Sequence, residues 1–515
     1  MYKKTIIKPN TYYDSVTLMS LGSKIKAVEG VKEAVVVMAT GMNKEILMNV
    51  GLGNEETEGA TQNDLIIAVE ARDEETCVEA HRMILDKLTK GSGQAGQEAE
   101  VEYKTIRHAV KDNRAANVAV ISVPGRYAAR EAKIALNSGL HVMMFSDNVS
   151  IEEERELKEL AVSKGLLMMG PDCGTAVINH TGLCFANEVR RGNIGVVGAS
   201  GTGLQEVIVQ IDRLGGGITQ ALGTGGRDLS REIGGLMMLH GIRALAKEPD
   251  TEIIVLVSKP PEQSVADKIF ELLDTLEKPV VVCFLEGDTA RKCREGVYLC
   301  DNLLDAARTA VKLAGVAQDA GREEARAARL KEEIAGARGL LQPGQKSVRG
   351  LFCGGTLCAE ALFVLRGRLG KIRSNVSHRD GEKIDGKEAC RGSVLLDLGD
   401  DEFTNGRPHP MIEPSLRNDK IAEQGDDPEV GVILLDFELG YGSHGDPAGE
   451  TVPAIREARA RARAQGRELA VVGYICGTAA DKQDFAGQRA ALLAEGVILA
   501  ESNVEAAQTA ADILL

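Results

Sequence analysis

Residues 196–206, VVGASGTGLQE, pass from a run of apolar residues through a glycine- and hydroxyl-rich turn into a helical pattern. A strand, a turn and a helix in this order are typical of parallel α/β sheets. The start of such a helix presents unpaired N–H groups and about half a positive charge. The stretch therefore predicts an α/β fold and a candidate anion site. Alone it is weak evidence, because most glycine-rich turns serve packing or helix capping.

The plan of this stretch recurs later in the chain. Residues 194–211 match residues 348–365, VRGLFCGGTLCAEALFVL. Three further pairs of segments match in the same order: 218–235 with 393–412, 252–262 with 430–442, and 279–290 with 469–481. Two copies of a domain commonly pack about a pseudo-twofold axis, which would bring the two helix starts to one cleft. The predicted phosphate-binding residues are Ser200, Gly201, Thr202, Gly203, Gly354, Gly355 and Thr356, with simple helix capping as the alternative.

Alternating strand and helix patterns predict the organisation of the rest of the chain. Strands, helices and turns alternate between residues 117 and 172, which is typical of a Rossmann-like parallel sheet. A Gly/Ser/Gln-rich linker, Lys90 to Gln97, and an Ala/Arg/Glu-rich helix within residues 321–339 mark domain boundaries. The predicted fold is α/β: a small N-terminal α/β domain (1–90), a Rossmann-like domain (103–190), two duplicated flavodoxin-like parallel-sheet domains (191–318 and 347–515), and a charged linker (319–346) between them.

Composition excludes several classes of function. The formal charge of −15 argues against a nucleic-acid or anionic-membrane surface, because both require clustered basic residues. The ten cysteines contain no CxxC pair, so we expect neither a metal site nor disulfides. Neither a signal-peptide core nor a membrane-spanning apolar run is visible, and we expect a cytoplasmic protein.

Other candidate residues follow the ends of predicted strands, where ligands collect in parallel sheets. Arg227 and Asp228 follow one such strand, and Arg407 and His409 occupy the equivalent place in the second copy. We predict catalytic roles for His409, Arg227 and Arg407. Asp228 and Lys259 are predicted to bind substrate. The alternatives are a domain-interface salt bridge for Arg227, a structural role for His409 and a surface position for Lys259.

Several motifs resemble succinyl-CoA synthetase. GPDCGTAVI (170–178) and the stretch GNIGVVGASGTGLQE resemble its α-subunit, whereas VRGLFCGGTLCAEA and the final GYICGTAADKQ resemble the C-terminal domain of its β-subunit. With both halves on one chain, the sequence is similar to the FdrA family, which ISVPGRYAAREA, GGRDLSREIGG, VSKPPE and NGRPHPMIEPSLRN also resemble. The resemblance covers nearly the whole chain and is weakest before residue 113 and in residues 321–345.

This resemblance implies a degenerate CoA-binding domain at 103–190 and one of two reactions. The family includes proteins described as acyl-CoA synthetases and a component of the oxamate carbamoyltransferase of anaerobic allantoin degradation. That enzyme converts oxalurate and phosphate to oxamate and carbamoyl phosphate, which carbamate kinase can use. The chain departs from the synthetase in three ways: a GxTGxxG-like loop is absent, residues 293–300 lack the phosphorylated histidine, and neither an ATP-grasp domain nor a Walker motif is visible.

These departures favour a carbamoyltransferase component that holds phosphate or carbamoyl phosphate and requires no cofactor. CoA binding stays possible, although the glycine-rich fingerprint of a CoA-binding domain is missing from the sequence. The resemblance also implies a hetero-oligomer with other carbamoyltransferase subunits, a homodimer, or both, and a functional link to carbamate kinase. The alternatives are an ATP- and CoA-dependent acyl-CoA synthetase that uses partner subunits, and a non-catalytic scaffold.

Overall fold

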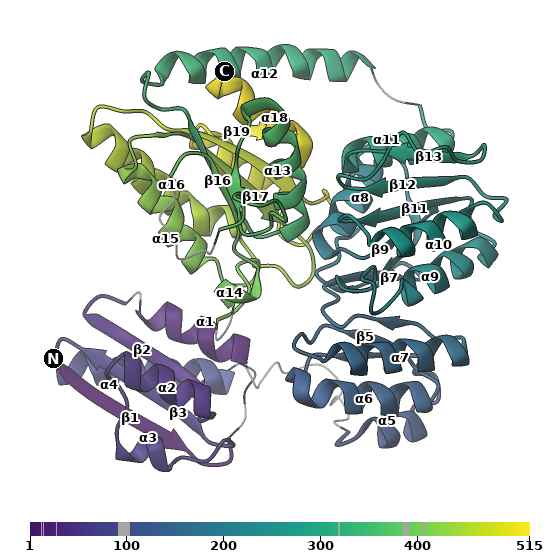
Figure 1. Cartoon of the computed structure of the whole chain (residues 1–515). Coiled ribbons are helices and arrows are strands. Elements are labelled where there is room, and N and C mark those ends of the chain that lie inside the picture. Colours follow the sequence, from purple (N-terminus) through teal and green to yellow (C-terminus); the bar gives the residue numbers. More distant parts are fainter. Residues whose placement is uncertain are drawn as a thin grey trace. The chain divides into compact units, whose positions relative to one another are not determined.

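The computed structural model describes residues 1–515 except 12, 14, 27, 91–102, 318–319, 385–390 and 405–406. The chain forms two compact units, Met1–Glu102 with Asp401–Glu413, and Tyr103–Asp400 with Pro414–Leu515 (Figure 1). All but the first residue of the predicted Gly/Ser/Gln linker lie outside the described residues. In the part of the chain that is described, no helix is both long and apolar enough to cross a bilayer.

The first unit is built on a three-stranded antiparallel sheet in the order β1-β3-β2. The predicted strands near residues 31–38 and 64–70 are present as β2 and β3. The central strand β3 is buried along its whole length, whereas the lysine-rich edge strand β1 was not predicted. The elements are β1 (Tyr2–Lys8), α1 (Ser15–Lys26), β2 (Val31–Met38), α2 (Gly41–Asn49), α3 (Glu55–Gly59), β3 (Leu65–Ala71) and α4 (Glu74–Lys90), and α14 (Asp401–Thr404) belongs to the same unit.

The second unit begins with a small parallel sheet in the order β4-β5-β6, as the alternating pattern of residues 117–172 predicts. Helices α6 and α7 connect its strands, and their alanine and leucine side chains form its core. The elements are α5 (Ile106–Asp112), β4 (Val118–Ile121), α6 (Gly125–Asn137), β5 (His141–Met144), α7 (Ile151–Lys164) and β6 (Met168–Met169).

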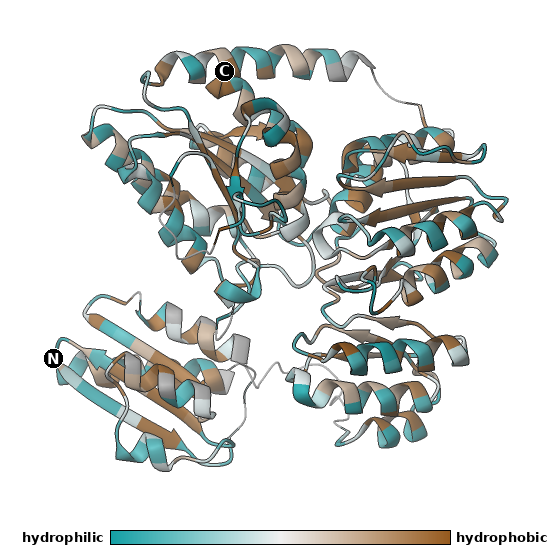
Figure 2. Cartoon of the chain, viewed as in Figure 1, coloured by the Kyte–Doolittle hydropathy of each residue, from teal (hydrophilic) through white to brown (hydrophobic). Residues whose placement is uncertain are grey.

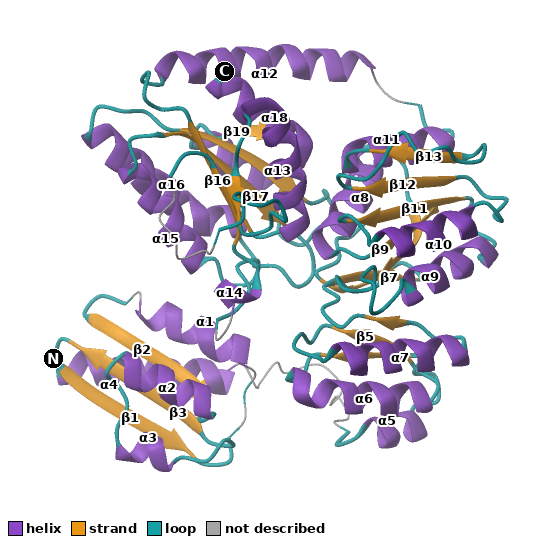
Figure 3. Cartoon of the chain, in the orientation of Figure 1, coloured by secondary structure: helices purple, strands orange, loops and turns teal. Residues whose placement is uncertain are grey.

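Two larger sheets follow, and they confirm the predicted duplication. The first has the order β13-β12-β11-β9-β10-β7-β8 and the second β15-β16-β14-β17-β18-β19. The series β10-β9-β11-β12-β13 and β16-β14-β17-β18-β19 are both parallel and both have the flavodoxin-like order 2-1-3-4-5. In Figure 3, helices lie on both faces of these sheets.

Buried Val, Ile and Leu fill the strands of both copies, which Figure 2 shows as hydrophobic segments. The first copy comprises β7 (Thr175–Ile178), β8 (Thr181–Cys184), β9 (Arg191–Gly198), α8 (Gly201–Arg213), β10 (Ile218–Gly223), α9 (Leu236–Lys247), β11 (Ile253–Ser258), α10 (Gln263–Leu273), β12 (Val280–Phe284), β13 (Val297–Cys300) and α11 (Leu303–Leu313). The second comprises β14 (Ser347–Phe352), α13 (Gly355–Leu369), β15 (Arg373–Ser374), β16 (Val394–Asp397), α15 (Ser415–Glu423), a 3₁₀ turn (Gln424–Asp426), β17 (Val430–Glu438), α16 (Pro447–Ala464), β18 (Ala470–Cys476), α17 (Phe485–Ala494), β19 (Ile498–Ala500) and α18 (Asn503–Leu514).

One continuous core joins the two copies through the helices α8, α11, α13 and α18. Within this core, a buried carboxyl group of each copy accepts a hydrogen bond from the other copy. Glu206 on α8 accepts the N–H of Asn503, at the start of α18, at 3.4 Å. Glu360 on α13 accepts the N–H of Leu303, at the start of α11, at 2.8 Å. Each copy therefore caps a helix of the other, which is the reciprocity expected of a pseudo-twofold axis.

Helix α12 (Ala320–Leu340) is the charged helix predicted between the copies. It is not wholly solvated, because Leu330 is buried against the shared core. Arg326 forms an ion pair with Glu505 of α18 at 2.7 Å, and Arg338 donates a hydrogen bond to the carbonyl of Asp512. The helix is thus anchored along α18 by one face.

Candidate functional site

The starts of α8 and α13 touch, one from each copy. Ser200 Oγ and Thr356 Oγ1 lie 2.6 Å apart, and the N–H of Thr356 donates to Thr202 Oγ1 at 3.4 Å. Ser200 is also the N-cap of α8, since its Oγ accepts the N–H of Gly203 at 3.0 Å. The predicted glycine- and hydroxyl-rich residues of the two copies thus meet at one point, and Ser200 also serves as a helix cap.

This meeting point lies where ligands bind in flavodoxin-like sheets. In each copy the strand order reverses between the first strand and its neighbour, β9 beside β11 and β14 beside β17, and α8 or α13 begins beyond that junction. Among the described residues, the N–H groups of Gly201, Thr202 and Gly355 make no hydrogen bond to the protein. Two sets of unpaired donors and two helix N-termini therefore converge there.

Acidic side chains surround the start of α13. Asp397 ends β16, and Asp436 and Glu438 lie two residues apart at the end of β17. All three are at most 7% exposed. Asp436 accepts the N–H groups of Cys353 and Gly354, each at 2.8 Å. The turn before α13 is therefore held by an internal carboxylate instead of a side-chain N-cap, which Gly354 cannot provide.

The charge of Asp436 is balanced inside the protein. Arg417, itself buried, lies 3.3 Å from Asp436 Oδ1 and donates to the Asp436 carbonyl at 2.6 Å. Burial, followed by the neighbouring Asp436, raises the pKa of Glu438 well above its ordinary value. Two buried carboxyl groups thus share one buried cation, so one of them keeps its proton, and that one is Glu438.

Asp397 and Lys259 of the other copy both lie beside Gly355. A side chain on Gly355 would collide with Asp397 Oδ2, and Lys259 Nζ lies 3.6 Å from the same point. Burial raises the pKa of Asp397 to about 7, and Lys259 opposes this rise. Asp397 can therefore gain or release a proton near neutral pH, which is a requirement for acid–base catalysis.

The site as a whole tolerates an anion despite its carboxyl groups. Arg417 neutralises Asp436, Glu438 is protonated, and Asp397 is partly protonated and lies near Lys259. The net charge of these groups is thus close to zero or positive. The dipoles of α8 and α13 add positive potential at the same point.

The structure places Arg227 and Asp228 in a different network. Arg227 forms an ion pair with Glu154 at 2.8 Å and donates to the carbonyl of Val149. Asp228 accepts two N–H groups at the start of α9 and pairs with the buried Lys158 at 2.8 Å. These contacts join α7 to the first copy, so the interface alternative describes Arg227, and we assign Asp228 the role of a helix cap. Neither residue contacts the starts of α8 and α13.

Arg407 and His409 lie in Asp401–Glu413, which groups with the first unit, and Asn405 and Gly406 of their motif are outside the described residues. Their catalytic roles stay predictions. Cys173 is buried, and burial raises the pKa of its thiol to about 12. A thiol with so high a pKa carries almost no thiolate at neutral pH, so Cys173 is not an activated nucleophile.

The ligand atoms of Cys353, Asp436 and Glu438 all lie within 4.8 Å of one another, close enough to hold a metal ion. However, Arg417 already balances Asp436, and Glu438 holds a proton. In this arrangement the cluster satisfies its charge without a cation. None of these acidic residues was predicted from the sequence, although a carboxylate that ends an apolar strand, as in VLLD and VILLDFE, is a usable signal.

Comparison with known proteins relates this architecture to known families. Residues 1–104 match a family described as "AllF, heavy metal-associated domain", residues 189–287 a "CoA binding domain", and residues 351–513 a "CoA-ligase". The uncharacterized protein YahF of Escherichia coli (strain K12) is 48% identical over 508 residues, which covers 98% of this chain and 97% of YahF.

More distant similarities involve proteins named as ligases or synthetases that act on CoA. The α-subunit of the ADP-forming succinate–CoA ligase of Aquifex aeolicus is 27% identical over 223 residues, or 42% of this chain and 70% of that subunit. A structure of a dinucleotide-forming acetyl-coenzyme A synthetase 1 of Ca. Korarchaeum cryptofilum covers 82% of this chain and 86% of its own, with 13% identity and a TM-score of 0.31. The sequence and family matches confirm the resemblance to succinyl-CoA synthetase, and they favour a CoA-ligase type of protein over a carbamoyltransferase.

The names of these matches imply a heavy metal for residues 1–104 and CoA for residues 189–287. Residues 1–104 contain a single cysteine, Cys77, which is buried in the core, so they offer no thiolate pair for a heavy metal. At the start of α6, a side chain on Gly125 would overlap the backbone carbonyls of Asp147 and Asn148. This helix lies in residues 103–190, where the resemblance implies a degenerate CoA-binding domain, whereas the match described as "CoA binding domain" covers residues 189–287.

Proposed function

Because the chain belongs to the family of Escherichia coli YahF, a family with the succinyl-CoA synthetase type of fold, we propose that it is an acyl-transfer component that binds phosphate between the starts of α8 and α13. The contact of Ser200 with Thr356 carries this proposal, because it joins two helix N-termini from the two copies. A bound phosphate would take over the hydrogen bonds that these hydroxyls now make to each other. Lys259 adds a cation at the edge of the site.

The reaction that suits this site is phosphorolysis of an acyl donor. An oxygen of hydrogen phosphate attacks the acyl carbon, the bond to the leaving group breaks, and the proton of the phosphate passes to the leaving group. An acyl phosphate and the protonated leaving group result. Asp397 is well placed to relay this proton, since it lies beside Gly355 and titrates near neutral pH. The N–H groups of both helix starts stabilise the developing oxyanion.

The first donor class is an acyl thioester, as in an acid–thiol ligase. The matches of residues 189–287 and 351–513, and the similarity to a succinate–CoA ligase α-subunit, support this class. Partner subunits would then bind the nucleotide and complete the ligase. Residues 293–300, however, include no histidine that could carry a phosphoryl group onward.

The second donor class is a carbamoyl donor, which needs neither a phosphohistidine nor CoA. The missing histidine in residues 293–300 favours it. In this form the chain would be an FdrA-type component of an oxamate carbamoyltransferase. It would work with further subunits and pass carbamoyl phosphate to a carbamate kinase.

Titration of the full-length chain with inorganic phosphate tests the site. Thr356→Val should weaken binding by roughly tenfold or more, because it removes a hydrogen bond to a charged ligand. Thr219→Val is the matched control, since Thr219 and Thr251 form the same kind of buried hydroxyl pair, at 2.6 Å, at the other end of the strands. Equal affinities of the two variants would refute the site.

The donor class is tested with the chain and its partner subunits in two assays. One follows thiol release from succinyl-CoA and phosphate, and the other follows carbamoyl phosphate formation from oxalurate and phosphate. Activity in one assay alone selects the donor. Binding of phosphate without activity in either assay would leave a scaffold with an anion site and contradict the proposed reaction.

A further inference from the structure

Strand β4 lies at the edge of the small sheet but has the sequence of an internal strand. Residues 118–121 read VAVI, an apolar run that is typical of a parallel strand covered on both faces. Yet β4 pairs with β5 alone, and Val120 is 51% exposed. An exposed apolar edge strand is a template for pairing with another chain, which proteins ordinarily protect with charges, prolines or a covering element.

The free edge of β4 offers backbone groups at Val118 and Val120. The carbonyls of Asn117 and Ile121 accept N–H groups from the β5 side. Because the hydrogen bonds of a strand alternate between its two sides, the N–H and carbonyl groups of Val118 and Val120 point away from β5. A further strand therefore finds donors and acceptors along this edge.

Basic residues lie on both sides of β4 in the sequence, although the chain as a whole has a formal charge of −15. They precede β4, on and around α5, or lie on α6, against which α5 packs (Figure 1). All are exposed, and none forms an ion pair within the described part of the chain: Lys104, Arg107, Lys111, Arg114, Arg126 and Arg130. Residues 103–131 contain only two acidic residues, Asp112 and Glu131. This part of the surface is thus basic.

Exposed apolar side chains accompany these charges. Val123, in the turn after β4, is 40% exposed, and Tyr127, in the first turn of α6, is 50% exposed. The guanidinium carbon of Arg126 lies 4.8 Å from the centre of the Tyr127 ring. Arginine and aromatic side chains are enriched where proteins bind proteins. The free backbone edge favours the same kind of partner, because a polypeptide strand can pair with it.

We propose that β4 is the docking site for an extended acidic segment of a partner protein, which pairs with β4 as an additional strand. Side chains of such a segment point alternately to the two faces of the sheet. Acidic groups on the helix face meet the basic surface, and apolar groups on the other face pack beside Val120. A second copy of this chain suits the edge less well, because antiparallel pairing of β4 with itself brings Arg114 and Arg126 of the two copies together. This inference does not depend on the phosphate site.

A fluorescently labelled peptide in which glutamate and valine alternate is the probe for this site. We expect it to bind the full-length chain with an affinity that falls as the salt concentration rises. Val120→Pro removes the N–H group at the free edge, which an edge strand tolerates, and should abolish binding. Val120→Thr keeps this N–H group and should bind the peptide as the natural chain does.

Charge reversal tests the same site without altering the strand. Arg126→Glu combined with Arg130→Glu should weaken binding of the peptide by roughly tenfold or more, because attraction to the basic surface becomes repulsion. Arg243→Glu combined with Lys247→Glu is the matched control, since these two residues are also exposed and one turn apart on a helix, α9. The control should leave the affinity unchanged.

Three outcomes would overturn the proposal. The docking site is wrong if the peptide does not bind, or if either Val120→Pro or the reversal on α6 leaves its affinity unchanged. Tighter binding of a single-stranded oligonucleotide, or displacement of the peptide by CoA, would assign the basic surface to phosphate groups. A dimer of the natural chain that Val120→Pro converts to a monomer would make a second copy the occupant. None of these outcomes bears on phosphate binding between α8 and α13.

Discussion

In the first copy of the duplicated domain, the helix facing the site begins with a serine whose hydroxyl caps it. In the second copy, the corresponding helix begins with a glycine and is held by the carboxylate of Asp436. The residues at the strand ends also differ: the first copy contributes the cation Lys259, and the second contributes the carboxyl groups of Asp397 and Glu438. One strand order thus supports two chemistries. The first copy supplies hydroxyls and a cation, and the second supplies the groups that can hold a proton.

The largest difference between the copies should be the cost of removing a cation. Arg417→Met in the second copy leaves Asp436 buried without a counter-charge, and we expect it to lower the free energy of unfolding by about 3–5 kcal/mol. Lys259→Met in the first copy removes a partly exposed cation and should cost less than about 0.5 kcal/mol, although it should weaken phosphate binding. Urea unfolding of the two variants compares them directly. Similar costs would show that the buried pair does not stabilise the second copy.

Glu206 and Glu360, which cap helices across the interface between the copies, should make the stability of the folded chain depend on pH. Burial, followed by the charge of Glu206, raises the pKa of Glu360 from 4.5 to about 7. Between these values the folded chain keeps a proton that the unfolded chain has released. The resulting stabilisation is complete below about pH 4.5 and is lost as the pH rises towards 7. Its size is on the order of 3 kcal/mol, at 1.36 kcal/mol per pKa unit.

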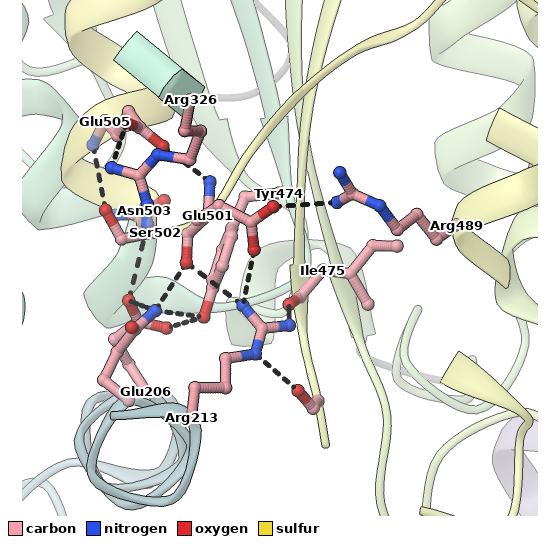
Figure 4. A network of polar contacts seen from close by, with 12 residues as sticks. Glu206, Arg213, Arg326, Tyr474, Ile475, Arg489, Glu501, Ser502, Asn503 and Glu505 are labelled. Carbon is pink, nitrogen blue, oxygen red and sulfur yellow. Dashed lines mark hydrogen bonds and ion pairs between the residues drawn. The ribbon is translucent and has the colours of Figure 1, made fainter. Parts of the chain in front are cut away.

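Glu360→Gln isolates this effect because its amide does not titrate. The difference in unfolding free energy between the natural chain and the variant should shrink or reverse between pH 4.5 and 7. Glu206→Gln serves as the comparison in the first copy, where burial also raises the pKa but Tyr474 and Gln210 donate to the carboxylate. Figure 4 shows Glu206 in contact with Tyr474 and Asn503. Arg213, on the same helix as Glu206, donates a hydrogen bond to the carbonyl of Glu501. A pH-independent difference for Glu360→Gln would contradict the proposed titration.

The shared plan of the two copies was predictable, whereas their difference was not. Buried strands rich in Val and Ile, each followed by a glycine-rich turn, specify a parallel sheet locally, and the repeat of residues 194–211 predicted the meeting of two helix starts. Ser200 and Thr356 lie together as this repeat predicted, and the binding roles of these two residues and of Lys259 stay predictions. Arg227 was not placed correctly, because its partner Glu154 comes from a helix of another domain.

The acidic residues were missed for a similar reason. Asp436 and Glu438 alternate with apolar residues at the end of a strand, where a single sequence cannot show which of them is paired, protonated or exposed. Their partner Arg417 lies on α15, and only its contact with Asp436 in the folded chain reveals that one cation serves two carboxyl groups. Electrostatic partners that are far apart in the sequence are brought together only by the tertiary structure, so local sequence patterns do not predict them.

The smallest predicted effect concerns the first residue of each helix at the site, Gly201 in α8 and Gly355 in α13. A methyl group at Gly201 would have its nearest neighbour, Thr175 Oγ1, at 3.9 Å, so Gly201→Ala should be neutral or stabilise the chain by up to about 0.5 kcal/mol. At Gly355 the methyl group would collide with Asp397, whose other oxygen is held by the N–H of Gly399 at 3.0 Å. Gly355→Ala should therefore cost about 1–3 kcal/mol.

The same pair separates stability from function. Asp397 must move to admit the methyl group of Gly355→Ala, so this variant should also shift the pH dependence of phosphorolysis, which Gly201→Ala should leave unchanged. Thermal melts and pH–rate profiles of both variants measure the two effects. If both glycines tolerate alanine equally, then Asp397 is mobile in solution, and the close packing that distinguishes the second copy is not needed to place its acid.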